Sequence, residues 1–238
     1  MPVRIVQRIA TPPAQSPHFT QSRQFSITPA VPASDYHDPN TTNSQEETVY
    51  TVSLSVSPQL HESMNHLRST YFPKKLNRLS AHLTLFHALP GSELEARIIP
   101  VIDSIAAKTP CYPIEVGRPV RMKHGILLPA RHMGEERLRR TEEIHKEMKR
   151  NWEQFLSRQD RQGLRLHWTI MNKVDDSGKV DKAEREVGGF LRSKQEQLAT
   201  RSEVEGFVTG LVLWRYDHGR WKEPREFKFQ RQADDVKV

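Results

Sequence analysis

The feature that most constrains this chain is a short pattern that occurs twice. His82-Leu83-Thr84-Leu85 and His167-Trp168-Thr169-Ile170 each read histidine, apolar residue, threonine, apolar residue. Because successive side chains of a β-strand point to opposite faces, each stretch places an imidazole and a hydroxyl on one face and two apolar groups on the other. Two such strands facing each other would line a pocket with two imidazoles and two hydroxyls.

The same alternation extends beyond both patterns. The faces opposite the histidines are apolar, as expected for strands that pack under helices. Buried histidine and threonine side chains without partners would be costly, and a polar cleft open to a ligand removes that cost. The predicted cleft faces carry Ser80, His82, Thr84 and Phe86 on the first strand, and Arg165, His167, Thr169, Met171 and Lys173 on the second.

These faces supply the candidate site residues. Phe86 and Met171 share the predicted cleft faces and could touch a base or a ribose, although core packing is an equally good interpretation. His87 follows His82 by an odd number of residues, so alternation predicts that it points away from the cleft and packs or makes a supporting hydrogen bond. Arg165 and Lys173 would add positive charge beside the second histidine.

Two histidines and two threonines suit phosphate chemistry. An imidazole titrates close to neutral pH, so one histidine can take a proton from water while the other gives a proton to the leaving oxygen. The threonine hydroxyls can donate hydrogen bonds to phosphate oxygens as charge develops there. A single histidine of this kind is most often structural, and the hypothesis depends on the matched pair.

The chain resembles the two-histidine phosphoesterase superfamily, which contains the 2′,5′ RNA ligase-like proteins and cyclic nucleotide phosphodiesterases. The resemblance covers roughly residues 48–230 and depends on the two patterns, their separation and the run from Leu83 to Gly91. It implies that His82 and His167 are the acid/base pair and that Thr84 and Thr169 bind phosphate. It also implies metal-independent action on 2′,3′-cyclic phosphates or related phosphodiesters. Ala81, where many relatives have proline, and the bulky Trp168 depart from the pattern.

The order of predicted elements indicates an α+β fold. Each half reads helix, His-x-Thr strand, helix and strand pair, so we expect two pseudo-duplicated lobes with mainly antiparallel sheets, helices outside and a central cleft. A long helix is predicted from Gly134 to about Arg158, and another over residues 180–200, interrupted at Gly188-Gly189. The folded domain is predicted over residues 47–232, between a leader (1–46) and a short tail (233–238).

The leader has the composition of a segment that does not fold alone. It holds seven of the 16 prolines, it has no glycine, and it is rich in Ser, Thr and Gln. Arg4, Arg8 and Arg23 all precede the first acidic residue, Asp35, as in a mitochondrial transit peptide. We therefore expect the mitochondrial matrix, with an ordinary disordered tail and a cytoplasmic or nuclear protein as the alternative.

Composition excludes several classes of protein. One cysteine, Cys111, excludes a disulfide framework and a multi-cysteine zinc site, and no glycine-rich phosphate loop occurs. No metal and no cofactor are expected, because no acidic cluster accompanies either histidine. No apolar run reaches the length of a membrane span. The net charge of +7 favours a nucleotide or RNA substrate, and a monomer is expected.

The predicted function is a hydrolase: a phosphodiesterase for 2′,3′-cyclic or 2′,5′-linked nucleotide or RNA ends. The sequence leaves open which histidine is the acid, and whether the direction is hydrolysis or ligation. A non-catalytic nucleotide- or RNA-binding module of the same fold is the first alternative. A mitochondrial RNA-associated structural protein, based only on leader and charge, is the second.

Overall fold

The computed structural model describes residues 46–131, 138–197 and 205–230. The predicted leader, apart from its last residue, and the predicted tail lie outside the described residues. The transit peptide and the mitochondrial location therefore stay predictions, as do the exact domain boundaries.

The first strand and helix form as the sequence predicts. From Thr51 onward β1 (Val49–Val56) alternates small polar with apolar residues, as expected of a strand with one apolar face. α1 (Pro58–Tyr71) begins with proline, whose missing N–H is not needed in a first helical turn. Leu60, Met64 and Leu67 of α1 are buried, as their spacing indicates. Ser57 does not cap α1 with its hydroxyl; that oxygen accepts a hydrogen bond from the Phe207 amide at 3.3 Å.

The next segment contains the first motif. β2 (Leu83–Pro90) is followed by a 3₁₀ turn (Gly91–Glu93), a π-helical turn (Leu94–Ile98) and α2 (Ile99–Lys108). Pro100 lies in the first turn of α2, where a missing N–H is tolerated, and the π-helical turn before it supplies a change of helical geometry.

The remaining elements include the second motif strand. They are β3 (Tyr112–Val116), β4 (Val120–Met122), β5 (Gly125–Arg131), α3 (Leu138–Trp152), β6 (His167–Met171), α4 (Ser177–Gln197), β7 (Glu205–Asp217) and β8 (Arg220–Lys228).

Two helix predictions need correction. α3 ends at Trp152 rather than near Arg158, although the buried stripe continues through Phe155. Its predicted start, Gly134, lies outside the described residues. α4 runs unbroken through Gly188 and Gly189, because glycine weakens a helix without necessarily ending it.

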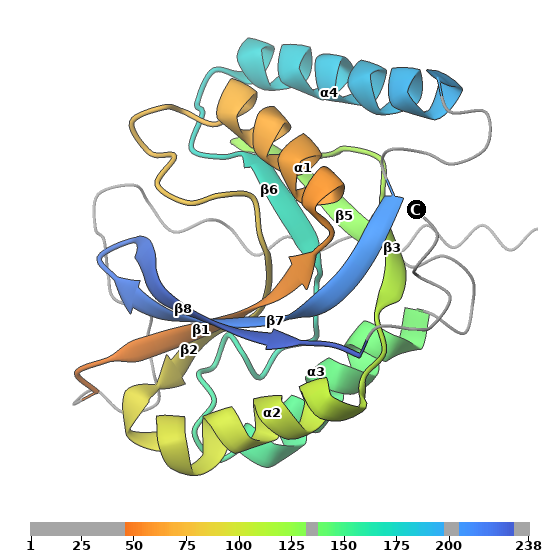
Figure 1. Ribbon diagram of the computed structural model, residues 1–238. Coiled ribbons are helices and arrows are strands. Elements are labelled where there is room, and N and C mark those ends of the chain that lie inside the picture. Colours follow the sequence, from red (N-terminus) through yellow and green to blue (C-terminus); the bar gives the residue numbers. More distant parts are fainter. Residues whose placement is uncertain (1–45, 132–137, 198–204, 231–238) are drawn as a thin grey trace, which may run out of the picture. The chain divides into compact units, whose positions relative to one another are not determined.

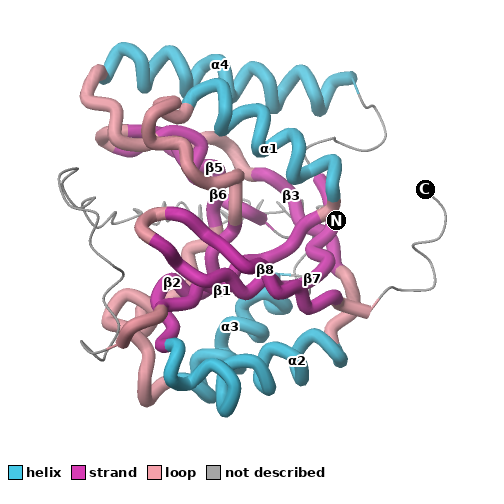
Figure 2. Tube along the Cα trace, turned by 60° about the vertical axis from the view of Figure 1, so that its left-hand side comes forward, coloured by secondary structure: helices cyan, strands magenta, loops and turns pink. Residues whose placement is uncertain are grey.

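The strands build two lobes joined by one pairing. β2, β1, β7 and β8 form one lobe, and β3, β5, β4 and β6 form the other; β3 pairs with β7 to connect them. Every pairing between these strands is antiparallel. Figure 1 shows α1 and α4 on one side of the strands and α2 and α3 on the other, and Figure 2 shows the same layers after rotation. This is the predicted two-lobed α+β architecture with outer helices.

The two motif strands occupy comparable places. β2 stands at one end of the strand order, and β6 pairs with β5 towards the other end. The hairpin between β7 and β8 turns at His218 and Gly219, both with positive φ (47° and 80°), as a tight turn of this kind requires. No helix in the described parts of the chain is long and apolar enough to cross a membrane.

Candidate active site

The two motif histidines are held in the same way. His82 lies directly before β2, and His167 is the first residue of β6. His82 Nδ1 lies 2.7 Å from the Ser80 carbonyl oxygen, and His167 Nδ1 lies 2.6 Å from the Arg165 carbonyl oxygen. Because a carbonyl oxygen only accepts, Nδ1 must carry the hydrogen in both rings. Each neutral imidazole therefore has Nε2 as its proton acceptor, the state that a general base needs.

The two threonines lie two residues after the histidines, on their strands. Thr84 stands opposite Ser53 of β1, and Thr169 stands opposite Leu127 of β5. Both threonines are partly exposed. Strand alternation to this point follows the prediction, so each histidine shares a face with its threonine.

Arg68 of α1 forms hydrogen bonds to the backbone next to both motifs. Its side chain is buried (5% exposed), and its guanidinium donates to the Leu79 carbonyl at 3.0 Å and to the Thr169 carbonyl at 2.5 Å. A third bond reaches Asn77 Oδ1 at 3.0 Å. One side chain thus connects the segment that leads into β2 with the second motif strand. The sequence gives no local signal for this role.

The surroundings keep both histidines neutral. Burial is the main cause that lowers the pKa of His82 to about 4, and the charges of Arg68, His87 and His167 act in the same direction. Burial also lowers the pKa of His167, against the opposing bond to the Arg165 carbonyl, and His87 lowers it further. An anionic phosphate between the rings would reverse this balance and favour a protonated imidazole.

The low pKa of His82 predicts a loss of stability in acid. Between the ordinary pKa of 6.5 and the folded-state value of about 4, the unfolded chain binds a proton that the folded protein does not. The His82 contribution to the free energy of unfolding is therefore fully present above pH 6.5 and is lost as the pH falls to about 4. Part of the ring remains accessible, so the loss is at most about 3 kcal/mol.

Urea unfolding of the wild type and of His82→Gln between pH 4 and 7 measures this loss, because glutamine does not titrate. Parallel pH profiles for the two proteins would contradict the assignment.

Both motif strands carry a β-bulge directly after the threonine. On β2, Thr84 pairs with Ser53 while Phe86 pairs with the adjacent Val52, so Leu85 is an extra residue. On β6, Thr169 pairs with Leu127 while Met171 pairs with the adjacent Ile126, so Ile170 is the extra residue. An extra residue reverses the alternation of side chains beyond it.

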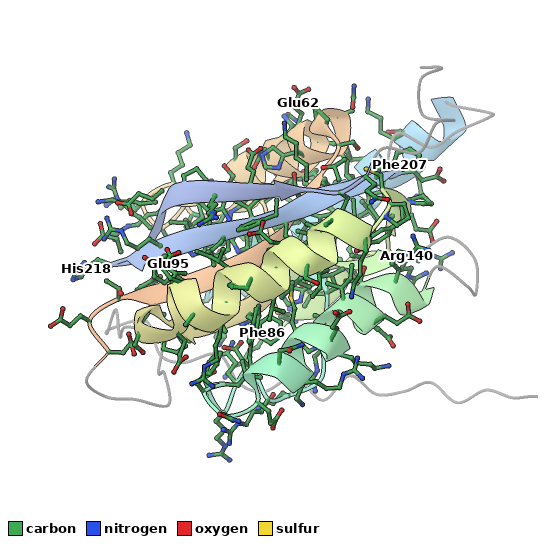
Figure 3. The ribbon with its side chains drawn as sticks, turned by 60° about the horizontal axis from the view of Figure 1, so that its bottom comes forward. Glu62, Phe86, Glu95, Arg140, Phe207 and His218 are labelled. Carbon is green, nitrogen blue, oxygen red and sulfur yellow. The ribbon has the colours of Figure 1, made fainter. Side chains whose placement is uncertain are left out.

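The bulges overturn two predicted substrate contacts. Phe86 was placed on the cleft face, but it is fully buried, with its ring centroid 4.7 Å from that of His145 and 5.0 Å from that of Trp152. Figure 3 shows Phe86 on the side of the sheet that α2 and α3 cover. Met171 is also buried, in a small cluster with Ile126 and Val180. Both belong to the core and not to the cleft lining.

His87 makes a supporting hydrogen bond as predicted, with Nδ1 3.3 Å from Asp160 Oδ1, but its predicted direction is wrong. The irregular register turns His87 to the side of Thr84, and about half of its side-chain surface (48%) is exposed. A signal for the bulges was present: in each strand two consecutive apolar residues follow the threonine, and they break the alternation.

The predicted cations lie at the two ends of β6. Arg165 precedes the strand and is exposed. Lys173 follows the strand end at Met171, with a positive φ of 61°, so strand alternation does not place its exposed side chain on the face of His167. Substrate contact by Arg165 and Lys173 stays a prediction.

A cavity of about 380 Å³ opens beside His82. Trp214 of β7 and Trp221 of β8 line it, and the Trp221 ring centroid lies 4.3 Å from that of His82. Trp214 Nε1 donates to Ser53 Oγ at 2.9 Å, which fixes its ring. The sequence alone does not indicate that Trp221 lies beside His82, because only strand pairing brings β8 near the first motif.

No group of three or more metal-ligating side chains occurs among residues 46–131, 138–197 and 205–230.

Comparisons with known proteins place these features in a family. The model of the 2′-5′ RNA ligase superfamily matches residues 56–220. No protein with a curated description matches the sequence significantly.

Several solved structures are similar at low identity. LigT of E. coli complexed with 3′-AMP is 12% identical, over 77% of this chain and 98% of that chain, with a TM-score of 0.49. TT0787 of Thermus thermophilus is 13% identical, over 76% and 99%, with a TM-score of 0.47. Usb1 of Kluyveromyces marxianus is 14% identical, over 76% and 97%, with a TM-score of 0.39.

The matched region contains both His-x-Thr motifs and both bulged strands. This chain therefore belongs to the 2′-5′ RNA ligase superfamily, a family of two-histidine phosphoesterases.

Proposed function

We propose that this protein is a metal-independent phosphodiesterase that acts on 2′,3′-cyclic or 2′,5′-linked nucleotide or RNA phosphodiesters. The observation that carries the proposal is the matched geometry of the two histidines. Each donates Nδ1–H to a carbonyl two residues earlier in the chain, so each presents Nε2 as a base. A structural histidine has no need of such a matched partner.

The proposed reaction uses the two imidazoles in opposite roles. The neutral one takes a proton from water at Nε2 while the water oxygen forms a bond to phosphorus. The bond between phosphorus and one ribose oxygen breaks, and the second, protonated imidazole gives its proton to that oxygen. Because the pKa of both histidines is lowered in the free protein, the acid gains its proton when the anionic substrate binds.

Two further features support a nucleotide as the substrate. Thr84 and Thr169, one on each motif strand, can donate hydrogen bonds to non-bridging phosphate oxygens. The cavity lined by Trp214 and Trp221 offers indole faces on which a base can stack.

The direct test is incubation with 2′,3′-cyclic nucleotides in the presence of EDTA. We expect a nucleoside monophosphate as product, at a rate that the chelator does not change. Chromatography that separates the 2′- and 3′-monophosphates shows which bond to the ribose breaks. Activity that EDTA abolishes and added metal restores would reject the metal-independent mechanism.

The same experiment separates a non-catalytic nucleotide-binding module. The packing of Trp221 on His82 favours this second candidate, because a binding module needs no histidine that readily takes up a proton. Tight binding of the cyclic nucleotide with no product over long incubation would support it.

A further inference from the structure

His87 stands on the same strand face as the first motif. The register against β1 shifts at Leu85 and again after Phe86, so that His87 and Ala88 both stand opposite Thr51. Thr51 lies two residues from Ser53, the partner of Thr84, and residues opposite Thr51 therefore share the face of Thr84, whereas Phe86 is buried in the core. The neighbouring strand fixes its backbone, because the Thr51 hydroxyl donates to the His87 carbonyl at 3.1 Å. The side chain remains half exposed, whereas both neighbours in the chain are buried.

A buried aspartate holds the ring. Asp160 lies in the segment that leads to the second motif, and its side chain is 1% exposed. Its carboxylate accepts from the amides of His87 at 2.8 Å and Ala88 at 3.0 Å, and from the Ser157 hydroxyl at 2.9 Å. The His87 Nδ1 lies 3.3 Å from the same carboxylate.

This arrangement sets the direction of the imidazole. Burial raises the pKa of Asp160, but its bonds to His87 outweigh that effect and hold the pKa below its usual value. The carboxylate is therefore ionised and accepts from His87 Nδ1. When Nε2 donates to a phosphate, the imidazole carries both hydrogens, and the two anions stabilise that form. Nε2, on the other side of the ring from the aspartate, is left for a partner outside the fold.

The other motif strand has no counterpart of this pair. Asn172 follows Thr169 by the same three residues that separate His87 from Thr84. The Asn172 side chain accepts from the Lys173 amide at 2.8 Å and so completes a local turn. The two halves are alike in their histidine, threonine and bulge, and they differ at this position.

We propose that His87 binds a second phosphate of the substrate, next to the phosphate that the two threonines hold. The proposal deepens the proposed function, on which it rests, because it names the substrate class: a nucleotide or RNA end that carries a phosphate on the 5′ side of the reacting one. Because Leu85 is an extra residue, Thr84 and His87 are about two strand steps apart, roughly 7 Å, a distance that one nucleotide can bridge. His87 also lowers the pKa of both His82 and His167, so it lies near both motif histidines.

Binding of two ligands that differ by one phosphate tests this assignment. Isothermal titration calorimetry compares adenosine 3′-monophosphate with adenosine 3′,5′-bisphosphate, for the wild type, His87→Asn and His87→Gln. The readout is the ratio of the two affinities. We expect the wild type to prefer the bisphosphate by about tenfold, the size of one charge-assisted hydrogen bond. In both variants the ratio falls to about one.

A second histidine beside an aspartate provides the matched control. His124, at the turn between β4 and β5, lies 3.1 Å from Asp175, beyond the end of β6 that is opposite to His167. His124→Asn should keep the wild-type ratio. Thermal unfolding of each variant confirms that the fold is retained, and His87→Asn keeps a donor that can reach Asp160.

Two results would overturn the proposal: a wild-type protein without preference for the bisphosphate, or a preference that both His87 variants retain. Its failure is distinct from failure of the proposed function, because binding of these ligands needs no turnover. A protein that hydrolyses cyclic nucleotides but shows no such preference keeps the function and loses the second phosphate site. A protein whose preference depends on His87 but which shows no turnover keeps the second phosphate site and loses the proposed function.

Discussion

We expect alanine at His82 or at His167 to lower the turnover of a 2′,3′-cyclic nucleotide by about two to four orders of magnitude, the usual contribution of a general acid or base. Each substitution removes one proton-transfer group and leaves the other with its own carbonyl partner, Ser80 or Arg165. The measurement is single-turnover product formation with the protein in excess, so that substrate binding does not limit the rate.

The double variant sharpens this prediction. Two groups that act in one step are not additive, so removing both costs little more than removing either one. His124→Ala serves as the control, because it removes an imidazole at the far end of the second lobe. Turnover that stays within twofold of the wild type in both single variants would reject acid/base catalysis by this pair.

Much of the site could be predicted because it depends on local order. Alternation places His82 with Thr84 and His167 with Thr169. In α1 the apolar residues at three- and four-residue steps, Leu60, Met64 and Leu67, are buried. The α+β class follows from the order of these elements.

The errors in the predicted site have one local cause and one long-range cause. Alternation was carried past Leu85 and Ile170, where an extra residue reverses it, and this misplaced Phe86, Met171 and His87. The long-range contacts have no signal in a single sequence. Asp160 meets His87 across 73 residues, and Arg68 meets Thr169 across 101 residues.

Replacing Arg68 by methionine should destabilise the protein by about 3 kcal/mol or more, because hydrogen bonds to a charged donor are each worth roughly 1.5–3 kcal/mol and the acceptors are largely buried. The carbonyls of Leu79 and Thr169 and the side chain of Asn77 lose their donor. The contact of the guanidinium with the Phe72 ring, 4.0 Å from its centroid, is lost as well. Burial lowers the pKa of Arg68 to about 10, so the side chain is still charged at neutral pH.

Urea unfolding at pH 7 measures this loss, and two other variants calibrate it. Arg68→Lys keeps the charge but cannot reach all three acceptors at once, so an intermediate loss is expected. Arg121→Met breaks an exposed ion pair with Asp181 and should cost no more than about 1 kcal/mol. Equal losses for Arg68→Met and Arg121→Met would show that the buried bonds contribute nothing to stability.

Turnover of the Arg68 variants, measured well below their melting temperatures, separates stability from positioning. The bonds that orient each histidine are local to its own motif and do not involve Arg68. The placement of the second motif relative to the segment before β2 does involve it. In a folded Arg68→Met protein we therefore expect kcat to fall by a larger factor than KM rises. The two proton transfers need both imidazoles at the correct separation, whereas substrate binding tolerates a small shift. A folded variant with wild-type kcat would mean that other contacts alone set that separation.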